Sequence, residues 1–383
     1  MDRKALGKYS AKMKCQPLEP GEPVKLYERA IVIPACAELE FLPETLESLK
    51  LNPKDILDKT LIIVVVNNSI ESPDGKKSQN IMMLEDFRKG NHPHNFFWMD
   101  LASAGREIDA KCGVGGARKA GMDTALKYLV QSDDSLIFSL DADTLVEGDY
   151  ISSGIEYFKN NPASPGAVFD FNHRRVGDVA IDTAIGLYES FIRNYADELK
   201  AAGSPYGYHV LGSAIVCRAL SYMRCGGMRE RNGGEDFYFL QALRKLGIIG
   251  GIVSSCVHPS PRPSDRVPFG TGPKVSKIAL DGKLAFYNSA IFELLHIFLK
   301  HVNGLSVEEM LVPEFLVPDS MPEEIKSFLA KYSFCGSWKN IIKNTPHEKR
   351  RLVDAFNCWF DAFRTLKFVH FCENEFSDKY SRV

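Results

Sequence analysis

The chain has 383 residues, of which 45% are hydrophobic and 25% are charged, and its formal net charge is −2 at pH 7. This composition predicts a globular protein with a sizeable core. The near-neutral charge argues against a strongly electrostatic partner, so we expect no nucleic-acid binding. The nine cysteines are odd in number and form no Cys-x-x-Cys pair, which favours free thiols in a reducing cytoplasm over disulfides or a zinc ribbon.

The sequence predicts neither a signal peptide nor a membrane-spanning helix. The N-terminal stretch MDRKALGKYSAKMKCQPLEPGEP is polar and lacks the apolar core of a signal peptide. The most apolar stretch, at 284–299, is too short to span a bilayer and contains Glu293 and His296. We expect a packed helix there and a cytoplasmic protein, while association with a membrane surface and a homodimer are left open.

The first part of the chain alternates apolar runs with amphipathic segments. Strands are predicted where β-branched and other apolar residues run together, and helices where apolar residues recur at helical spacing. In chain order these are a strand at 29–36, a helix at 38–50, strands at 60–69 and 95–102, a helix at 113–130 and a strand at 135–143. The polar residues from 71 to 95 predict an excursion between two strands.

The second part of the chain is less regular. It predicts a helix at 150–162, a strand at 166–175, a helix at 180–200, a strand and short helix within 210–228, a helix at 233–247 and a loop at 253–273. The alternation predicts an α/β fold with a mostly parallel sheet flanked by helices. We expect one domain at 28–272 and a mainly helical C-terminal extension at 273–383.

Polar residues follow three of the predicted strands. Ligands of parallel sheets bind beyond the carboxyl ends of the strands, which here are Pro34–Glu38, Asn67–Ser69 and Asp141–Asp143. Taken alone, the two aspartates fit either a turn or a divalent metal site that holds phosphates. Three polar strand ends that line one crevice favour the metal site.

Six motifs occur together in a fixed order. They are IVIPACAELEFLPETLESL, VVVNNS, GGARKAGMDTAL, FSLDADTLVEGDYI, GSAIVCRA and GGEDFYFLQALRKLG. This ordered set resembles the family 2-like glycosyltransferases of the GT-A fold, the nucleotide-diphospho-sugar transferase superfamily. The resemblance covers about residues 29–260, and it implies a transferase that uses nucleotide-diphosphate sugars.

The resemblance implies where the donor binds. Family members commonly have acidic residues where this chain has Asn67 and Asn68, so the identity of the base stays open, and a simple turn remains an alternative for this pair. Arginines near the expected phosphates can form bidentate contacts with them. The expected nucleotide-sugar ligands are Pro34, Ala35, Ala37, Glu38, Asn67, Asn68, Ser69, Arg118, Asp141, Arg262 and Arg266.

The resemblance also implies a metal ion and a catalytic base. Asp143 is expected to bind Mn²⁺ or Mg²⁺ directly, with Asp141 near the ribose or bound through water, and His258 as a third ligand that favours Mn²⁺. Asp236 is the expected base of an inverting reaction, with Glu235 as support or substitute. The alternatives are a loop histidine at 258 and helix-capping carboxylates at 235–236.

The leading hypothesis is therefore a metal-dependent, hexosyltransferase-type glycosyltransferase with a hydroxyl acceptor. One alternative is a retaining GT-A transferase that uses His258 as a metal ligand, and another is a non-catalytic protein that binds nucleotide sugars. A nucleotidyltransferase is disfavoured, because no basic glycine-rich loop follows the first predicted strand.

Overall fold

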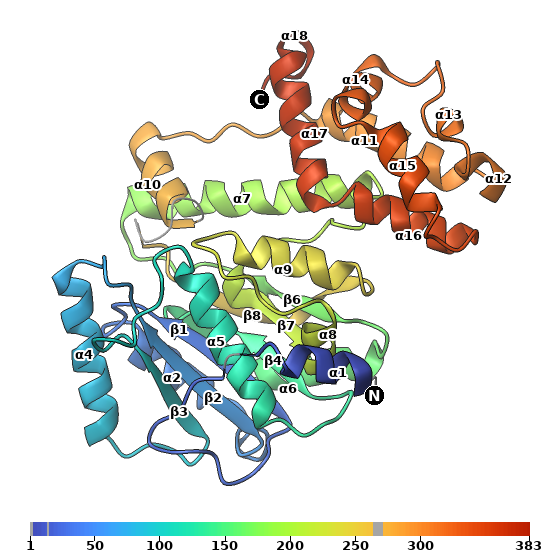
Figure 1. Ribbon diagram of the computed structural model, residues 1–383. Helices are drawn as coiled ribbons and strands as arrows, with labels where there is room; N and C mark the ends of the chain where they lie inside the picture. Colours follow the sequence, from blue (N-terminus) through green and yellow to red (C-terminus); the bar gives the residue numbers. More distant parts are fainter. Residues whose placement is uncertain (1–2, 14, 263–270) are drawn as a thin grey trace. The chain divides into compact units, whose positions relative to one another are not determined.

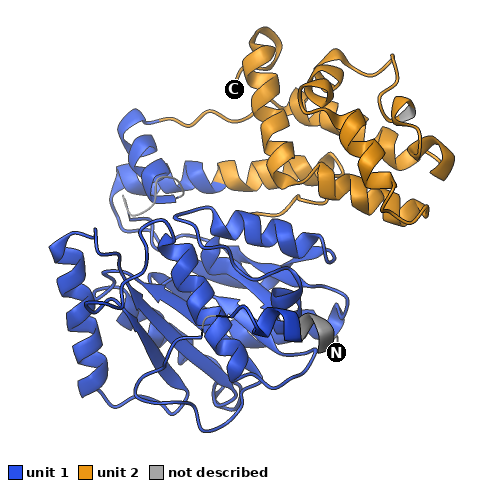
Figure 2. Cartoon of the chain, viewed as in Figure 1, with its two compact units in different colours: residues 1–189, 210–282 blue, residues 190–209, 283–383 orange. Residues whose placement is uncertain are grey.

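The structure is a computed structural model that describes residues 3–13, 15–262 and 271–383 (Figure 1). It contains two compact units (Figure 2). The first comprises residues 1–189 and 210–282, and the second comprises residues 190–209 and 283–383. Both units are thus built from segments that are not contiguous in sequence. The domain boundary expected between residues 272 and 273 stays a prediction.

The first unit is built on a sheet that has eight strands in the described residues, in the spatial order β3-β2-β1-β4-β7-β6-β8-β5. The strands are β1 Arg29–Ala35, β2 Thr60–Asn67, β3 Phe96–Leu101, β4 Leu136–Ser139, β5 Thr144–Val146, β6 Gly166–Phe171, β7 Ile215–Arg218 and β8 Ile249–Pro259. β1 is parallel to β2 and to β4, β2 is parallel to β3, and β6 is parallel to β8. β7 is antiparallel to β4 and β6, and β5 is antiparallel to β8. The predicted α/β fold with a mostly parallel sheet is confirmed.

Helices of the first unit flank this sheet, except for the last of them (Figure 1). They are α1 Arg3–Ser10, α2 Leu42–Leu49, α3 Lys54–Leu57, α4 Asp74–Lys89, α5 Gly113–Lys127, α6 Tyr150–Asn160, α8 Ala219–Arg224, α9 Glu235–Arg244 and α10 Thr271–Asp281. The long helix α7, Val179–Ala201, begins in the first unit and ends in the second. Residues 71–95, predicted as an excursion, therefore contain a helix of 16 residues.

The centre of the sheet is buried on both faces. Every residue of β1 and β2 is buried, which explains their continuous apolar sequences. Helix α5 packs closely on these strands at Gly121, where an added Cβ would lie 2.4 Å from Val32 Cγ1 and 2.8 Å from Val65 Cγ2. A glycine at this position therefore allows the helix that carries Arg118 to approach the sheet.

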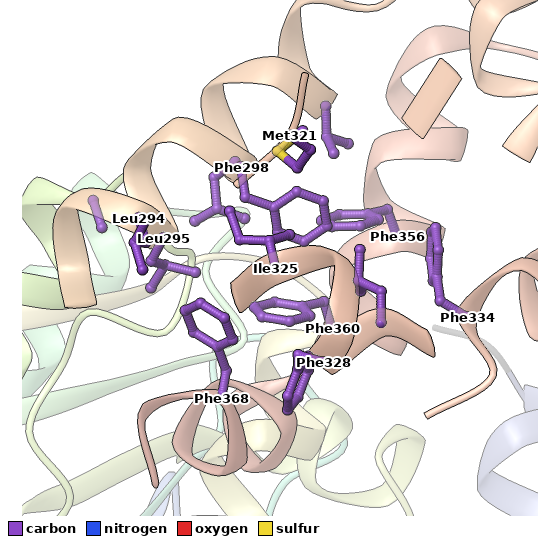
Figure 3. Close-up of a cluster of buried hydrophobic side chains, with 14 of the residues drawn as sticks. Leu294, Leu295, Phe298, Met321, Ile325, Phe328, Phe334, Phe356, Phe360 and Phe368 are labelled. Carbon is purple, nitrogen blue, oxygen red and sulfur yellow. The ribbon is translucent and has the colours of Figure 1, made fainter. Parts of the chain in front are cut away.

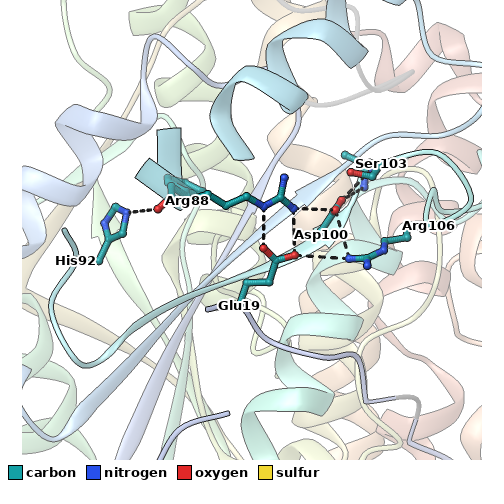
Figure 4. A network of polar contacts seen from close by, with 8 residues as sticks. Glu19, Arg88, His92, Asp100, Ser103 and Arg106 are labelled. Atoms are coloured by element: carbon teal, nitrogen blue, oxygen red, sulfur yellow. Dashed lines mark hydrogen bonds and ion pairs between the residues drawn. The ribbon is translucent and has the colours of Figure 1, made fainter. Parts of the chain in front are cut away.

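A polar network fixes the far edge of the sheet, at the end of β3 (Figure 4). The Asp100 carboxylate accepts hydrogen bonds from the backbone N–H groups of Ala102 and Ser103, at 3.1 and 2.9 Å. Arg88 of α4 contacts Asp100 and donates two hydrogen bonds to Glu19, at 3.0 and 3.1 Å. This network ties the N-terminal segment and α4 to the edge strand.

The second unit is helical and has its own aromatic core. Its helices are α11 Ser289–Gly304, α12 Val307–Met310, α13 Pro313–Leu316, α14 Glu323–Lys331, α15 Phe334–Ile342, α16 Lys349–Trp359, α17 Ala362–Glu375 and α18 Ser377–Tyr380. Phe298, Phe328 and Phe356 belong to this core (Figure 3). Leu199 and Ala202, from the segment in the middle of the chain, belong to the same core. No helix in the described ranges is long and apolar enough to cross a membrane.

Candidate active site

The ends of β1 and β2 are joined by one buried side chain. Asn80 of α4 is fully buried, and its Oδ1 accepts a hydrogen bond from the backbone N–H of Ala37 at 2.8 Å. Its Nδ2 donates to the backbone O of Asn67 at 3.0 Å and to Oδ1 of Asn68 at 2.8 Å. Ala37 has a φ of 55°, so the chain turns sharply at this point. Asn80 thus holds together two of the predicted donor-binding segments.

The side chain of Asn67 contains a buried acceptor that is not satisfied by the described residues. It is only 6% exposed, and its Oδ1 has no hydrogen-bond partner in the part of the chain that the structure describes. A buried acceptor without a donor costs free energy, of the order of 1–3 kcal/mol. A ligand N–H group at this position would remove that cost. Asn68 differs, because its amide already bonds to Asn80 and to the backbone of Ala102.

The other predicted residues of these two strand ends lie nearby in sequence and space. Pro34 and Ala35 are the last two residues of β1, and both are buried. Ser69 follows β2, and its backbone N–H donates to Oγ of Ser72 at 3.1 Å. These segments are therefore ordered by contacts within the protein.

Glu38 and Asp143 converge on one arginine. Nη2 of Arg262 lies 2.5 and 2.6 Å from the two carboxylate oxygens of Glu38, and 2.9 Å from Oδ2 of Asp143. The guanidinium also lies over the ring of Phe41, at 4.2 Å from its centroid. The structure thus brings the end of β1, the second aspartate and the segment after β8 together, and it places one positive charge between two carboxylates.

His258 has different neighbours. It lies on β8 opposite Leu145 of β5, so the prediction of a loop from residue 253 onward was wrong as far as Pro259. Its Nδ1 is 3.0 Å from the backbone O of Asn172, and its Nε2 is 3.3 Å from Oε1 of Glu147. Among residues 3–13, 15–262 and 271–383, no three His, Cys, Asp or Glu side chains are grouped as a metal site. The metal role of His258 stays a prediction, and Arg266 lies outside the described residues.

Arg118 is the most enclosed charged group of the site. Its side chain is 3% exposed and makes ion pairs with Asp141 and Glu235. Nε donates to Oε1 of Glu235 at 3.0 Å, Nη1 donates to Oγ of Ser139 at 2.6 Å, and Nη2 donates to Oδ1 of Asp141. Ser139 in turn donates to the backbone O of Gly212 at 2.7 Å. One side chain of α5 thus connects the first aspartate with the start of α9.

The two carboxylates at the start of α9 have altered acidity. Burial, together with the charge of Asp236, raises the pKa of Glu235 to about 7, although Arg118 opposes this shift. Burial also raises the pKa of Asp236, against the opposing effect of Arg118. Gly234, which precedes them, has a φ of 68°, a left-handed conformation that glycine adopts readily. Both groups therefore hold a proton at higher pH than ordinary carboxylates.

Sequence reasoning missed three residues that shape this site: Asn80, Ser139 and Gly212. The buried positions of α4 are Asn80, Met83, Leu84 and Phe87, which follow the i, i+3, i+4, i+7 spacing of a helix face. This spacing could have revealed a helix with one polar residue on its buried face. Ser139 and Gly212 lie within two of the six motifs, but their role was missed because only the folded chain brings them to Arg118.

No family model matches the chain, and no curated protein matches it. Among solved structures, S. aureus TarS in complex with UDP-GlcNAc is 12% identical, over 85% of this chain and 90% of that chain, with a TM-score of 0.42. The mannosyltransferase PcManGT from Pyrobaculum calidifontis, in complex with GDP-Man and Mn²⁺, is 15% identical over 93% and 94%, with a TM-score of 0.37.

A third match is glucosyl-3-phosphoglycerate synthase from Mycobacterium tuberculosis in complex with UDP. It is 10% identical over 59% of this chain and 70% of that chain, with a TM-score of 0.36. Because all three TM-scores lie below 0.5, the chemistry of this chain has to be argued from its own side chains.

Proposed function

We propose that the protein is a glycosyltransferase that moves a sugar from a nucleotide-diphosphate sugar to a hydroxyl acceptor. The observation that carries this proposal is the buried, unpartnered Oδ1 of Asn67, at the same edge of the sheet as Asp141 and Asp143. An acceptor that awaits an N–H group suits a nucleobase. Carboxylates at the neighbouring strand end suit the cation that accompanies a diphosphate.

The nucleoside is proposed to bind across the ends of β1 and β2. Ala37, Asn67 and Asn68 are held in place by Asn80 through hydrogen bonds of 2.8–3.0 Å. The amide of Asn67 would read the edge of the base, with Oδ1 as the acceptor. Because Asn80 fixes this geometry beforehand, little ordering would accompany binding.

Glu38 and Asp143 supply the carboxylate oxygens that a divalent cation completed by phosphate oxygens would use in place of their contacts with Arg262. Asp143 offers a hard oxygen ligand and is 19% exposed, and the carboxylate of Glu38 meets the same arginine nitrogen. Mg²⁺ in particular commonly uses one or two carboxylates plus substrate phosphates. We propose that Asp143 holds the Mn²⁺ or Mg²⁺, with Asp141 beside it. When bound, the ion would stabilise the negative charge that develops on the leaving diphosphate.

Asp236 is proposed to accept the proton of the acceptor hydroxyl. Its raised pKa makes it a stronger base than an ordinary carboxylate once it is ionised. Glu235 is 3% exposed and bonded to Arg118, so it supports Asp236 from within the protein. Of the two, Asp236 is the more exposed and the better placed to meet a substrate.

Nucleotide binding and donor hydrolysis test the proposal. UDP and GDP should raise the Tm of the wild-type protein in the presence of Mn²⁺, and one of a panel of UDP- and GDP-sugars should be hydrolysed. Asp143→Ala should remove the Mn²⁺ dependence of both effects. Asp149→Ala is the matched control, because Asp149 is exposed and makes no capping hydrogen bond.

Two results would contradict the proposal. A wild-type Tm that responds to neither nucleotide nor Mn²⁺ would remove the donor site. Nucleotide binding without hydrolysis or transfer of any donor would instead favour a non-catalytic protein that binds nucleotide sugars. Equal hydrolysis by Asp143→Ala and the wild type would remove the metal assignment alone.

A further inference from the structure

Arg118 lies between the donor side and the acceptor side of the proposed site. Asp141 follows β4 and belongs to the donor side, whereas Glu235 begins α9 and adjoins the proposed base Asp236. The guanidinium of Arg118 contacts both carboxylates and also Ser139. Arg118 thus links the donor side and the acceptor side through hydrogen bonds, and it comes from a third element, α5.

The surroundings of Arg118 leave its guanidinium little room to reach a ligand. Its side chain is 3% exposed, and each of its three nitrogens donates to a protein oxygen. On one side Gly212 is so close that an added Cβ would lie 2.4 Å from Nη2. A phosphate could reach this group only if the protein partners gave way.

We propose that Arg118 is a positioning residue that sets the distance and orientation between Asp141 on the donor side and the Glu235–Asp236 pair on the acceptor side. The proposal rests on the proposed function, and it assigns Arg118 no direct contact with the nucleotide sugar. The planar guanidinium holds its partners in fixed directions, which a flexible ammonium group cannot do. Its effect should therefore fall on turnover more than on nucleotide binding.

The geometry explains why turnover should be sensitive. Asp141 accepts from Nη2 and Glu235 accepts from Nε of the same planar group, so a shift of one carboxylate moves the other. Misplacement of reacting groups by about 1 Å can lower a rate about 100-fold. The ends of β1 and β2, where the nucleoside is proposed to bind, are held by Asn80 and not by Arg118.

The experiment compares Arg118→Met with Arg118→Lys and with Arg218→Met. Arg218 is a suitable control because it is another buried arginine, 7% exposed, which bonds to backbone oxygens of Ser164 and Phe158 at 3.1 and 2.9 Å, away from the site. UDP and GDP with Mn²⁺ are the binding probes, and hydrolysis of the donor that the wild type accepts gives kcat and KM.

We expect Arg118→Met to lower kcat about 100-fold and to change the Kd for the nucleoside diphosphate by less than about threefold. Arg118→Lys keeps the positive charge but lacks the planar guanidinium. Compared with Arg118→Met, it should therefore restore the Tm more than it restores kcat. Arg218→Met should lower the Tm and leave kcat near the wild-type value. A large loss of nucleotide affinity at unchanged kcat would identify a donor ligand and overturn the proposal.

Two further outcomes would also overturn it: full recovery of kcat in Arg118→Lys, or equal losses of kcat in Arg118→Met and Arg218→Met. A cycle of Tm measurements needs no substrate and keeps the test separate from the proposed function. Arg118→Met combined with Glu235→Gln should lower the Tm by less than the sum of the two single changes, because each change removes the same hydrogen bond. Strict additivity would disprove the link, whereas a wild type inert to every donor would refute the proposed function.

Discussion

Gly212→Ala is a small change that should disturb the centre of the proposed site. The added Cβ would lie 2.4 Å from Nη2 and 3.0 Å from Cζ of Arg118. An ordinary contact is about 3.4 Å, so the guanidinium has to move by about 1 Å. Such a shift breaks at least one hydrogen bond between charged groups, which contributes about 1.5–3 kcal/mol. We expect the free energy of unfolding to fall by about 2 kcal/mol and donor hydrolysis by about 100-fold.

Thermal unfolding and donor hydrolysis measure the two effects. For a unit of this size, 2 kcal/mol corresponds to a fall in Tm of about 4–8 °C. Gly251→Ala is the matched control, since Gly251 is a strand glycine whose added Cβ would meet no atom within 4 Å. If Gly212→Ala kept both the Tm and the hydrolysis rate of Gly251→Ala, the close packing around Arg118 would not govern the site.

Three further predictions concern stability. Gly121→Ala should cost about 1–3 kcal/mol in thermal unfolding, because its Cβ would collide with Val32 and Val65. Phe328→Ala should cost about 3–5 kcal/mol in denaturant unfolding of the second unit, since the ring is fully buried. Glu235 keeps its proton up to about pH 7 in the folded protein, whereas the unfolded chain releases it near pH 4.3. Wild-type stability should therefore fall as pH rises from about 4.3 to 7, by about 3 kcal/mol, and Glu235→Gln should flatten this slope in urea titrations.

Each of these predictions can be contradicted by a specific result. Gly75→Ala is the control for the helix glycine, because it has open space around it and should be neutral or stabilising. A Gly121→Ala protein as stable as Gly75→Ala would contradict the close approach of α5 to the sheet. A pH slope in Glu235→Gln as steep as in the wild type would place the titrating group elsewhere, and a Phe328→Ala protein of wild-type stability would contradict the aromatic core.

The sequence was sufficient for the features that depend on local pattern. The strands at 29–36 and 60–69 read as buried because their apolar runs are continuous, and β1 and β2 are buried throughout. The alternation of strands and helices predicted the parallel sheet, and sheet topology then predicted that the polar ends of β1, β2 and β4 lie at one edge.

Other features depend on contacts that no local pattern encodes. A charged residue on a glycine-rich helix, such as Arg118, can face solvent, a ligand or the core. Its burial follows only from Ser139, Gly212 and Glu235, which come from distant segments. α4 is a different case: its buried positions follow helical spacing, but Asn80, which is buried through hydrogen bonds, makes the hydrophobic face less evident in the sequence. The neighbours of His258 likewise depend on the pairing of β5 with β8.

The route of the chain through the second unit has a practical consequence. Leu199 and Ala202 belong to its core, although 73 residues of the first unit, 210–282, lie between their segment and residue 283. A truncation after Gly282 would therefore remove most of that core and leave the end of α7 uncovered. A single cut cannot release either unit intact, so a deletion that divides the chain at one point should yield fragments that aggregate. Separating the two units would need a short linker in place of residues 190–209.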